Sequence, residues 1–389
     1  MRIAADWLMT PGARTVCALL AEGGHQAWFV GGCVRNAIIG AAATDIDITT
    51  DARPDRVMAL AQAAGLRVVP TGFDHGTVTV VVDGAPYEVT TFRRDVETDG
   101  RHAVVAFADS LEQDAARRDF TMNALYADAE GAVRDPLGTG LSDLAARHVR
   151  FIGDPGDRIR EDHLRILRFF RFHAWYGDPE GGVDAEGLAA CADLSDGILA
   201  LSRERIGAEM RKLLSAPDPA PAVAAMGMSG VLLRVLPGAG ALTLTVLVHV
   251  EEAAGLAPDW LRRLASLGGE GAPEALRLSN AETRRLAALQ EAMAADWPPA
   301  ETGWRLGAGD GTGALALRAA MAGQEVDSMA ALACAAGAQK QFPVKAADLM
   351  PALTGAALGA ELKRLETLWL RSGLTLDRTA LLAEAQKGT

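Results

Sequence analysis

The chain has 389 residues, which is too long for one typical hydrophobic core, so we expect it to divide into roughly two to four units. Its composition, with 49% hydrophobic and 23% charged residues, is ordinary for a soluble globular protein. The formal net charge of −12 argues against a protein that coats nucleic acid nonspecifically, although it does not exclude a local basic surface.

The cysteines are scattered along the chain and form no Cys-x-x-Cys pair. They are Cys17, Cys33, Cys191 and Cys334. This pattern fits the reducing cytoplasm and predicts neither a disulfide framework nor a structural zinc site. The N-terminal residues lack the apolar core of a signal peptide, and no apolar run reaches about 18 residues, so we expect no membrane span.

The first elements in chain order form a strand, a glycine turn and a helix. Residues 1–24 are expected to form a helix that enters the first domain, and the apolar run at residues 27–30 predicts a short buried strand. The strand ends at Gly31-Gly32, where the missing side chains allow a tight turn and the close approach of another group. A helix from Cys33 to Ile39 would direct backbone N–H groups toward these glycines. The arrangement suits phosphate, although two glycines before a helix more often form a plain turn.

A second strand is predicted from Asp45 to Thr50 because its residues alternate with a period of two. Asp45 and Asp47 would then point the same way, with Ile46 and Ile48 directed into the core. Two carboxylates beside a phosphate site suggest a divalent metal between protein and nucleotide, and the alternative is a solvated strand face. A dinucleotide-binding fold is the nearest competitor, but the glycine spacing is not G-x-G-x-x-G.

The chain continues with a predicted helix at residues 54–65, which has proline in its first turn. Two strands follow at residues 76–82 and 87–92, on either side of the turn pair Asp83-Gly84. These elements predict a mixed sheet with helices that ends near residue 140.

Glu88 lies in the second of these two strands. Alternation places Glu88, Thr90 and Phe92 on one face of the sheet. Glu88 could be an ordinary edge charge, or it could be a third acid beside Asp45 and Asp47 that helps to deprotonate an attacking hydroxyl.

Two charged segments follow the sheet. Residues 93–104 show no sustained periodicity and are expected to form a mobile loop next to the site. Arg117-Arg118-Asp119 opens an apolar helix and could form a surface salt bridge. The same residue types suit a nucleotide, because guanidinium groups bind phosphate and a carboxylate can accept from ribose hydroxyls.

From Leu141 onward the sequence predicts helices only. The most informative helix surrounds residues 161–171, where an apolar face is opposed by a stripe of arginines that starts beside Asp162. The arginines of this stripe are Arg165, Arg168 and Arg171. They could form a solvated face with internal ion pairs, but three arginines on one arc usually need an anionic neighbour.

Four motifs together resemble class II CCA-adding tRNA nucleotidyltransferases and the related bacterial poly(A) polymerases. They are Gly31-Gly32-x-x-Arg35, Asp45-x-Asp47, Arg117-Arg118-Asp119 with Asn123-Ala, and Glu161-Asp162-x-x-Arg165. The resemblance implies an α+β fold with a polymerase-β-like nucleotidyltransferase head that contains a mixed sheet, followed by an all-α neck, body and tail. The expected boundaries are 1–139 for the head, 140–215 for the neck, 216–300 for the body and 301–389 for the tail.

The resemblance also implies roles for individual residues. Asp45 and Asp47 would hold two Mg²⁺ ions, and the strand pattern described above adds Glu88 as a third catalytic acid. The implied nucleotide-binding residues are Gly31, Gly32, Arg35, Arg118, Asp119, Asp162, Arg165, Arg168 and Arg171. Among these, Asp162 and Arg165 would recognise the incoming base. The charged loop at residues 93–104 corresponds to the family's flexible element linked to the switch from C to A addition.

The activity implied by the resemblance is the addition of C, C and A to the 3′ end of tRNA from CTP and ATP. The expected partners are tRNA, ATP and CTP, with no membrane and no obligate protein partner. Poly(A) synthesis, or partial addition of CC or A, stays open within the family. A catalytically inactive RNA-binding protein is the alternative from another class, and the intact Asp45, Asp47 and Arg118 count against it.

This sequence departs from the family pattern in two places. Asn36 stands where many members have aspartate after the arginine, so one negative charge near the phosphates is missing. The chain also contains no His-Asp doublet, so a phosphohydrolase motif of the kind that some relatives carry is not supported.

Overall fold

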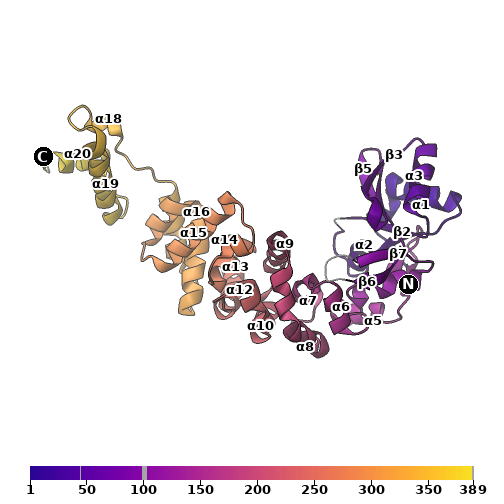
Figure 1. Ribbon diagram of the computed structural model, residues 1–389. Coiled ribbons are helices and arrows are strands. Elements are labelled where there is room, and N and C mark those ends of the chain that lie inside the picture. Colours follow the sequence, from indigo (N-terminus) through magenta and orange to yellow (C-terminus); the bar gives the residue numbers. More distant parts are fainter. Residues whose placement is uncertain (44, 99–102, 388–389) are drawn as a thin grey trace. The chain divides into compact units, whose positions relative to one another are not determined.

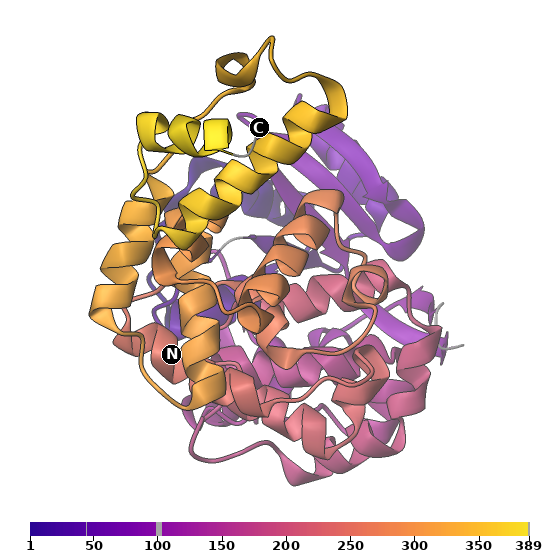
Figure 2. The ribbon, with the colours of Figure 1, turned by 90° about the vertical axis from the view of Figure 1, so that its left-hand side faces the viewer.

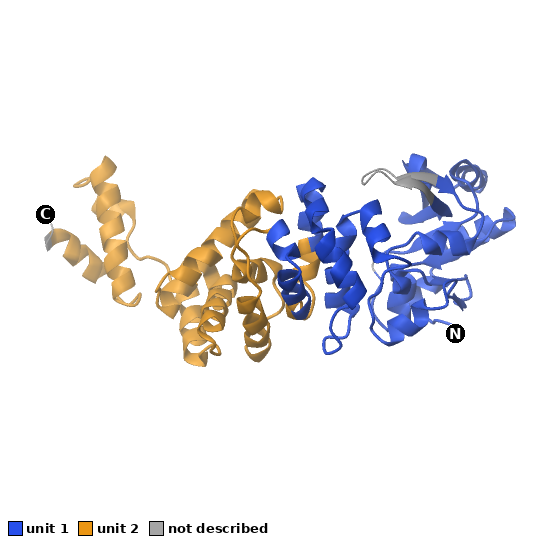
Figure 3. Ribbon diagram, turned by 60° about the horizontal axis from the view of Figure 1, so that its bottom comes forward, with its two compact units in different colours: residues 1–209, 221–235 blue, residues 210–220, 236–389 orange. Residues whose placement is uncertain are grey.

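The structure is a computed structural model in which the chain divides into two compact units (Figure 3). The described residues are 1–43, 45–98 and 103–387 (Figure 1). The first unit comprises Met1–Glu209 and Pro221–Val235, and the second comprises Met210–Ala220 and Leu236–Thr389. Within the described ranges, no helix is both long and apolar enough to cross a membrane. The finer division into head, neck, body and tail stays a prediction.

A mixed seven-stranded sheet forms the centre of the first unit, and the predicted α+β class is confirmed. The strands of this sheet are β1 (Ala27–Val30), β2 (Asp47–Thr50), β3 (Arg67–Gly72), β4 (Thr77–Val82), β5 (Ala85–Thr91), β8 (Tyr126–Ala127) and β9 (Val133–Arg134). Their order across the sheet is β3-β4-β5-β2-β1-β8-β9. β2 and β5 are parallel, whereas the other neighbouring strands are antiparallel.

The sheet has one face covered by helices α1 (Pro11–Glu22) and α3 (Pro54–Ala63), which pack against β4 and β5. A Cβ atom at Gly12 would lie 2.5 Å from the hydroxyl oxygen of Tyr87, so only glycine lets α1 approach β5 this closely. Because side chains alternate along a strand, the neighbouring Glu88 is directed to the opposite face, where it is exposed. The covered face is therefore the core, and the other face is open for a site.

The β4–β5 hairpin follows the sequence prediction closely. Asp83 and Gly84 both have positive φ angles, 50° and 82°, as the expected tight hairpin turn requires. The predicted strand at residues 27–30 is also confirmed as β1.

Several local features of the first unit differ from the prediction. Arg117-Arg118-Asp119 does not open a helix, because α4 (Leu111–Ala116) ends before it and only the 3₁₀ helix η3 (Thr121–Asn123) follows. The helix expected at residues 1–24 is interrupted: residues Asp6–Met9 form a 3₁₀ helix, η1, and α1 begins only at Pro11, after the N-cap residue Thr10. Strand β3 was not predicted. The segment at residues 93–104, expected to be a loop, forms most of an antiparallel ribbon of β6 (Arg93–Thr98) and β7 (Ala103–Phe107), with 99–102 outside the described residues.

Beyond Leu141 the described residues form helices apart from isolated β-bridges, as predicted. The remaining helices up to residue 235 are α2 (Gly32–Ile38), η2 (Phe73–His75), α4 (Leu111–Ala116), η3 (Thr121–Asn123), α5 (Gly140–Ala145), α6 (Pro155–Glu161), α7 (Leu164–Tyr176), α8 (Ala185–Asp193), η4 (Ser195–Ala200), α9 (Arg203–Leu214), α10 (Ala220–Met228) and α11 (Val231–Val235). The apolar face predicted for the α7 region is fully buried, with Ile166, Phe169 and Phe170 at 0% exposure.

The second unit is helical. Its remaining helices are α12 (Leu242–Ala253), α13 (Trp260–Leu267), α14 (Ala272–Ala275), α15 (Asn280–Ala294), α16 (Pro299–Ala322), α17 (Ser328–Ala338), α18 (Ala346–Leu349), α19 (Gly355–Arg371) and α20 (Arg378–Lys387). Helix α19 contacts α18 and α20, the yellow end of the chain in Figure 2. Trp369 of α19 is 2% exposed and anchors this core, where its ring meets those of Trp304 and Phe342.

Candidate functional site

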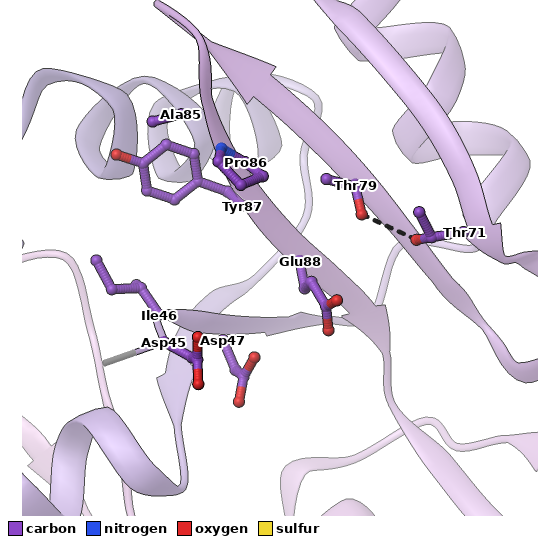
Figure 4. A pocket seen from close by; sticks show the side chains of 9 residues that line it. All are labelled: Asp45, Ile46, Asp47, Thr71, Thr79, Ala85, Pro86, Tyr87 and Glu88. Atoms are coloured by element: carbon purple, nitrogen blue, oxygen red, sulfur yellow. Dashed lines mark hydrogen bonds between the residues drawn. The ribbon is translucent and has the colours of Figure 1, made fainter. Parts of the chain in front are cut away.

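A row of polar side chains crosses the open face of the sheet. Asp47 of β2 lies opposite Glu88 of β5 in the parallel register, and Glu88 lies opposite Thr79 of β4 in the antiparallel register. Thr79 in turn shares a hydrogen bond of 2.8 Å with the hydroxyl of Thr71 on β3. Figure 4 shows the carboxylates of Asp45, Asp47 and Glu88 on the same side of the sheet. Three carboxylates and two hydroxyls therefore share one surface.

This surface is hollowed into a pocket of about 880 Å³ (Figure 4). The lining residues are Asp45, Ile46, Asp47, Thr71, Thr79, Ala85, Pro86, Tyr87 and Glu88. The prediction that Ile46 points into the core is wrong, because β2 begins only at Asp47 and the alternation does not extend to Ile46, which is half-buried beside the pocket. Ile48 is fully buried as predicted. Phe92, predicted to share the face of Glu88, lies beyond the end of β5 in a separate buried cluster.

The electrostatics of the pocket centre on Asp47. Desolvation raises the pKa of Asp47 although part of its side chain reaches solvent, and the negative charges of Glu88 and Asp45 raise the pKa further. The positive charge of Arg118 opposes this shift. The site thus concentrates negative charge at the carboxylates, and the guanidinium of Arg118 lies close enough to lower the pKa of Asp47 in part.

The glycine turn lies against two guanidinium groups. Gly31 has φ +71° and ψ −122°, a conformation that favours glycine. A Cβ atom at Gly31 would lie 3.5 Å from Nη1 of Arg118, and one at Gly32 would lie 3.8 Å from Nη2 of Arg35. Side chains at these two positions would fill space directly beside both arginines, so the glycines keep a polar cradle open.

Arg118 is oriented by hydrogen bonds to Asp114 and Tyr126, two residues that no sequence motif had pointed to. Its Nη2 donates to Oδ2 of Asp114 over 3.0 Å, and its Nε donates to the hydroxyl of Tyr126 over 3.1 Å. The Tyr126 hydroxyl donates to the same oxygen of Asp114 over 2.9 Å. Burial alone would raise the pKa of the Asp114 carboxyl, but the charges of Arg118 and Arg117 hold that pKa well below its usual range.

Arg35 is buried rather than presented to solvent, with 5% of its surface exposed. Its Nη2 donates to the hydroxyl of Tyr176 over 2.7 Å, and its guanidinium carbon lies 3.9 Å from the centre of the Tyr176 ring. Its Nη1 donates to Oδ1 of Asn123, and its Nη2 also donates to Oδ1 of Asn36 over 3.0 Å. Asn36, the departure from the family pattern, thus helps to orient Arg35. Burial lowers the pKa of Arg35.

Asp119 joins the segment after α4 to helix α7. Its Oδ2 accepts from Nε of Arg168 over 2.7 Å, and its Oδ1 accepts from Nδ2 of Asn123 over 2.9 Å and from the backbone N–H of Phe120 over 2.8 Å. Burial favours the protonated carboxyl, but Arg168 and these hydrogen bonds lower the pKa of Asp119 to about 2. Arg35, Asn123, Asp119 and Arg168 therefore form one continuous polar network.

The predicted helix at residues 161–171 is in fact two helices, because α6 ends at Glu161 and α7 begins at Leu164. Asp162 lies in the break, where its Oδ1 accepts from the backbone N–H of Leu164 over 3.1 Å. This hydrogen bond competes with a continuous helix, as aspartate side chains do at helix starts.

The structure does not pair Asp162 with Arg165. Asp162 accepts from Nη2 of Arg205 over 2.6 Å, whereas Nη1 of Arg165 donates to Glu161. The third arginine of the stripe, Arg171, donates through Nε to Glu209 over 2.5 Å. In this structure the anionic neighbours of the stripe are carboxylates of the chain itself.

Arg165 nevertheless contacts the segment that contains Arg118. Its Nη2 donates to the backbone carbonyl of Arg117 over 3.2 Å. The next residue, Arg118, faces Gly31 and acts electrostatically on Asp47. The structure therefore brings the four sequence motifs together around one locality.

Two family models match the chain. The first, described as Poly A polymerase head domain, matches residues 27–150, and the second, described as probable RNA and SrmB- binding site of polymerase A, matches residues 183–242. The mitochondrial CCA tRNA nucleotidyltransferase 1 of Mus musculus is 40% identical over 209 residues, covering 54% of this chain and 48% of the relative. The CCA-adding enzyme of Geobacillus thermodenitrificans is 41% identical over 217 residues, covering 55% and 52%. The chain spans about half the length of the curated relatives it matches.

Solved structures extend this similarity along the chain. The Bacillus stearothermophilus CCA-adding enzyme in complex with CTP has a TM-score of 0.69 and 27% sequence identity, and the match covers 94% of each chain. The Thermotoga maritima CCA-adding enzyme complexed with tRNA shares the fold, with a TM-score of 0.68 at 16% identity over 100% of this chain and 98% of that one. The matched head region, the shared fold and the four motifs agree. The chain is therefore similar to poly(A) polymerase head domains over residues 27–150, and it shares its fold with solved CCA-adding enzymes over nearly its whole length.

Proposed function

We propose that this protein is a nucleotidyltransferase that adds C, C and A to the 3′ end of tRNA, using CTP and ATP. One observation carries the proposal: Asp47 lies beside Glu88 on the sheet and close to Arg118, which faces the glycine turn. Arg165 donates to the backbone carbonyl of Arg117, the residue before Arg118. Relatives named CCA-adding enzyme, about 40% identical over 55–56% of this chain, support the same activity.

The residues fit the divalent metal ions that the family resemblance implies. Asp45 and Asp47 offer hard oxygen ligands, which Mg²⁺ prefers, and the carboxylate of Glu88 on the same surface adds negative charge that a cation would neutralise. Among the described residues, no group of three or more His, Cys, Asp or Glu side chains is arranged to hold a metal. The two aspartates would thus leave positions for phosphate and water oxygens, as Mg²⁺ sites usually do. Mg²⁺ bound there would activate the attacking hydroxyl and neutralise the departing pyrophosphate.

The positions of the other groups suggest how the two substrates meet. The cradle at Gly31 and Gly32, with the guanidinium of Arg118, would bind the triphosphate, because guanidinium groups match phosphate oxygens in pairs. The pocket beside Glu88 and Thr79 lies along the sheet from Asp47, and its lining includes no residue of the glycine turn. We infer that this pocket receives the terminal ribose of the RNA, with Glu88 close to its 3′-hydroxyl as a general base.

Base selection follows from the residue types at the start of α7. Cytosine and adenine each present an amino donor beside an unprotonated ring nitrogen, whereas uracil and guanine present a carbonyl beside a ring N–H. A carboxylate from Asp162 and a guanidinium from Arg165 would therefore match C and A. The wrong base would leave these groups unpaired, at a cost of several kcal/mol, or roughly 10⁴-fold.

In the structure Asp162 and Arg165 are occupied by Arg205 and Glu161. Nucleotide binding would therefore exchange these ion pairs for base contacts. Arg168 and Arg171, now paired with Asp119 and Glu209, would assist at the base or the phosphates. Asp119 would in turn accept from the ribose hydroxyl.

The test is an extension assay with a tRNA that lacks its 3′-terminal CCA. We expect three added nucleotides with CTP and ATP together, two with CTP alone, and none with UTP or GTP. Long A tails would indicate a poly(A) polymerase, and addition that stops after CC, or that requires a tRNA already ending in CC, would indicate a partial enzyme. The absence of any product with a tRNA that still binds would indicate an inactive RNA-binding protein.

A further inference from the structure

Asp114, inside the short helix α4, accepts more hydrogen bonds than the other described carboxylates near the cradle. Its side chain is 0% exposed, and its two oxygens accept hydrogen bonds from five donor atoms. The donors are the backbone N–H of Arg93, Nε and Nη2 of Arg117, Nη2 of Arg118 and the hydroxyl of Tyr126. A buried carboxylate with so many partners stays ionised and fixes the geometry of every group that donates to it.

The contacts of Arg118 anchor two of its three guanidinium nitrogens and leave Nη1 unanchored by them. Asp114 binds its Nη2 and Tyr126 binds its Nε, while the Tyr126 ring lies 5.4 Å from the guanidinium carbon. The remaining nitrogen, Nη1, is the one that faces Gly31. Two anchored nitrogens leave the planar guanidinium almost no rotational freedom, so Nη1 is aimed at the glycine turn before any ligand arrives.

The same carboxylate also holds the base of the β6–β7 ribbon. Oδ1 of Asp114 accepts from the backbone N–H of Arg93, the first residue of β6, over 3.2 Å. The preceding residue, Phe92, is tied to the main sheet through its N–H, which donates to the carbonyl of Thr50 over 2.7 Å. Asp114 therefore fixes the point where the chain leaves the sheet and enters the ribbon.

We propose that Asp114 is a positioning residue for nucleotide binding, which orients Arg118 toward the glycine turn and ties it to the start of the β6–β7 ribbon. The proposal rests on the proposed function, in which Arg118 binds the triphosphate. A purely architectural carboxylate would make the same hydrogen bonds. The two roles differ in one respect: a positioning residue loses its effect on nucleotide binding when Arg118 is already altered.

The experiment is a double-mutant cycle of Asp114→Asn and Arg118→Lys, read out as KM and kcat for CTP with a tRNA lacking CCA. We expect Asp114→Asn to raise the KM for CTP about tenfold, with kcat within about twofold and the KM for tRNA unchanged. In the Arg118→Lys background the same substitution should raise the KM for CTP less than about twofold. Independent, multiplying effects, or a loss confined to kcat, would overturn the proposal.

Two further variants keep the test decisive. Tyr126→Phe retains the charge of Asp114 and removes one partner of Arg118, so it should raise the KM for CTP about threefold, and not at all beside Arg118→Lys. Glu251→Gln is the matched control, because Glu251 is 2% exposed and accepts from Nε of Arg262 and of Arg263 in the second unit. It should lower the melting temperature without changing the KM for CTP. An equal rise in KM in this control would overturn the proposal.

The hydrogen bond between the backbone N–H of Arg93 and Asp114 can be tested separately by amide hydrogen exchange. The backbone N–H of Arg93 should exchange faster in Asp114→Asn and at the wild-type rate in Tyr126→Phe, since only the first substitution weakens its acceptor. Unchanged exchange in Asp114→Asn would overturn this part of the proposal. If the wild-type protein adds no nucleotide at all, the proposed activity fails separately, and the cycle is then measured on the affinity for CTP by calorimetry.

Discussion

Nε of Arg168 lies 2.7 Å from Oδ2 of Asp119, so a helix that follows the sheet domain donates directly to the motif at the end of α4. These two residues are 49 positions apart and belong to different sequence motifs. Asn123 extends the contact to Arg35 on α2. Three of the nucleotide-binding candidates, Arg35, Asp119 and Arg168, thus belong to one connected polar network.

The Asp119 pair predicts a specific loss of stability in acid. The pKa of Asp119 is about 2 in the folded protein and near its ordinary value of 3.8 when unfolded. The group therefore contributes stability that is fully present above the unfolded pKa and is lost as the pH falls through the folded pKa, up to about 2 kcal/mol. Urea unfolding between pH 7 and pH 3 should show a steeper decline for the wild type than for Asp119→Asn. Parallel curves for the two proteins would contradict the prediction.

Substitution of Asp47 should abolish catalysis without disturbing the RNA surface. Asp47→Asn removes a charged metal ligand, and we expect nucleotide addition to fall at least about 10³-fold for both CTP and ATP. Filter binding of tRNA should be unchanged. Asp55→Asn is the matched control, because Asp55 is an exposed acid in the first turn of α3, and it should retain full activity. Appreciable residual addition by Asp47→Asn would remove this residue from the proposed metal site.

The pocket beside Glu88 predicts that Thr79 acts on the RNA substrate. Thr79→Val preserves the side-chain shape but removes the hydroxyl that pairs with Thr71, so the KM for tRNA should rise about fivefold while the KM for CTP stays constant. Thr77→Val breaks a similar hydroxyl pair with Thr90, at 3.0 Å, outside the pocket lining and should leave both constants unchanged. A higher KM for CTP instead would place the nucleotide in this pocket.

Arg165 is predicted to control which nucleotide is accepted. Arg165→Ala should reduce the discrimination of CTP over UTP by about 10²-fold or more, because the donor to the ring nitrogen is lost. The ratio of kcat/KM for the two nucleotides is the measurement. Arg160→Ala is the control, since Arg160 lies on α6, is 61% exposed and pairs with Asp157 one turn away on the same helix. Full discrimination in Arg165→Ala would show that the base is recognised elsewhere.

The sequence predicted the elements whose local signals agree with their packing. The strand at residues 27–30 and the β4–β5 hairpin are set by an apolar run and by Asp83-Gly84. Strand β3 was not predicted because Pro70 interrupts the alternation of apolar and polar residues that marks a strand. In the structure β3 is an edge strand, and its register shifts between Val69 and Gly72, around the proline that cannot donate to a neighbour.

The residues of the site that belong to short sequence motifs could be predicted, and those outside the motifs could not. Asp45, Asp47, Glu88 and Arg118 were all named from their residue types and spacing, and their proximity is now described. Asp114, Tyr126 and Tyr176 were not found, because their importance lies in the side chains that they contact across the fold. One signal for Asp114 was present in the sequence. Arg117 and Arg118 follow it by three and four positions, the spacing at which side chains meet on one face of a helix.

The parallel pairing of β2 with β5 has a consequence for biosynthesis. Parallel neighbours cannot be joined by a tight turn, so β3 and β4 must be made before Asp47 and Glu88 can become neighbours. The emerging polypeptide therefore carries Asp47 without its neighbour Glu88 until the ribosome has released the segment through β5. The proposed acidic site is therefore completed late in the assembly of this sheet, through a contact between distant segments, and such contacts form slowly.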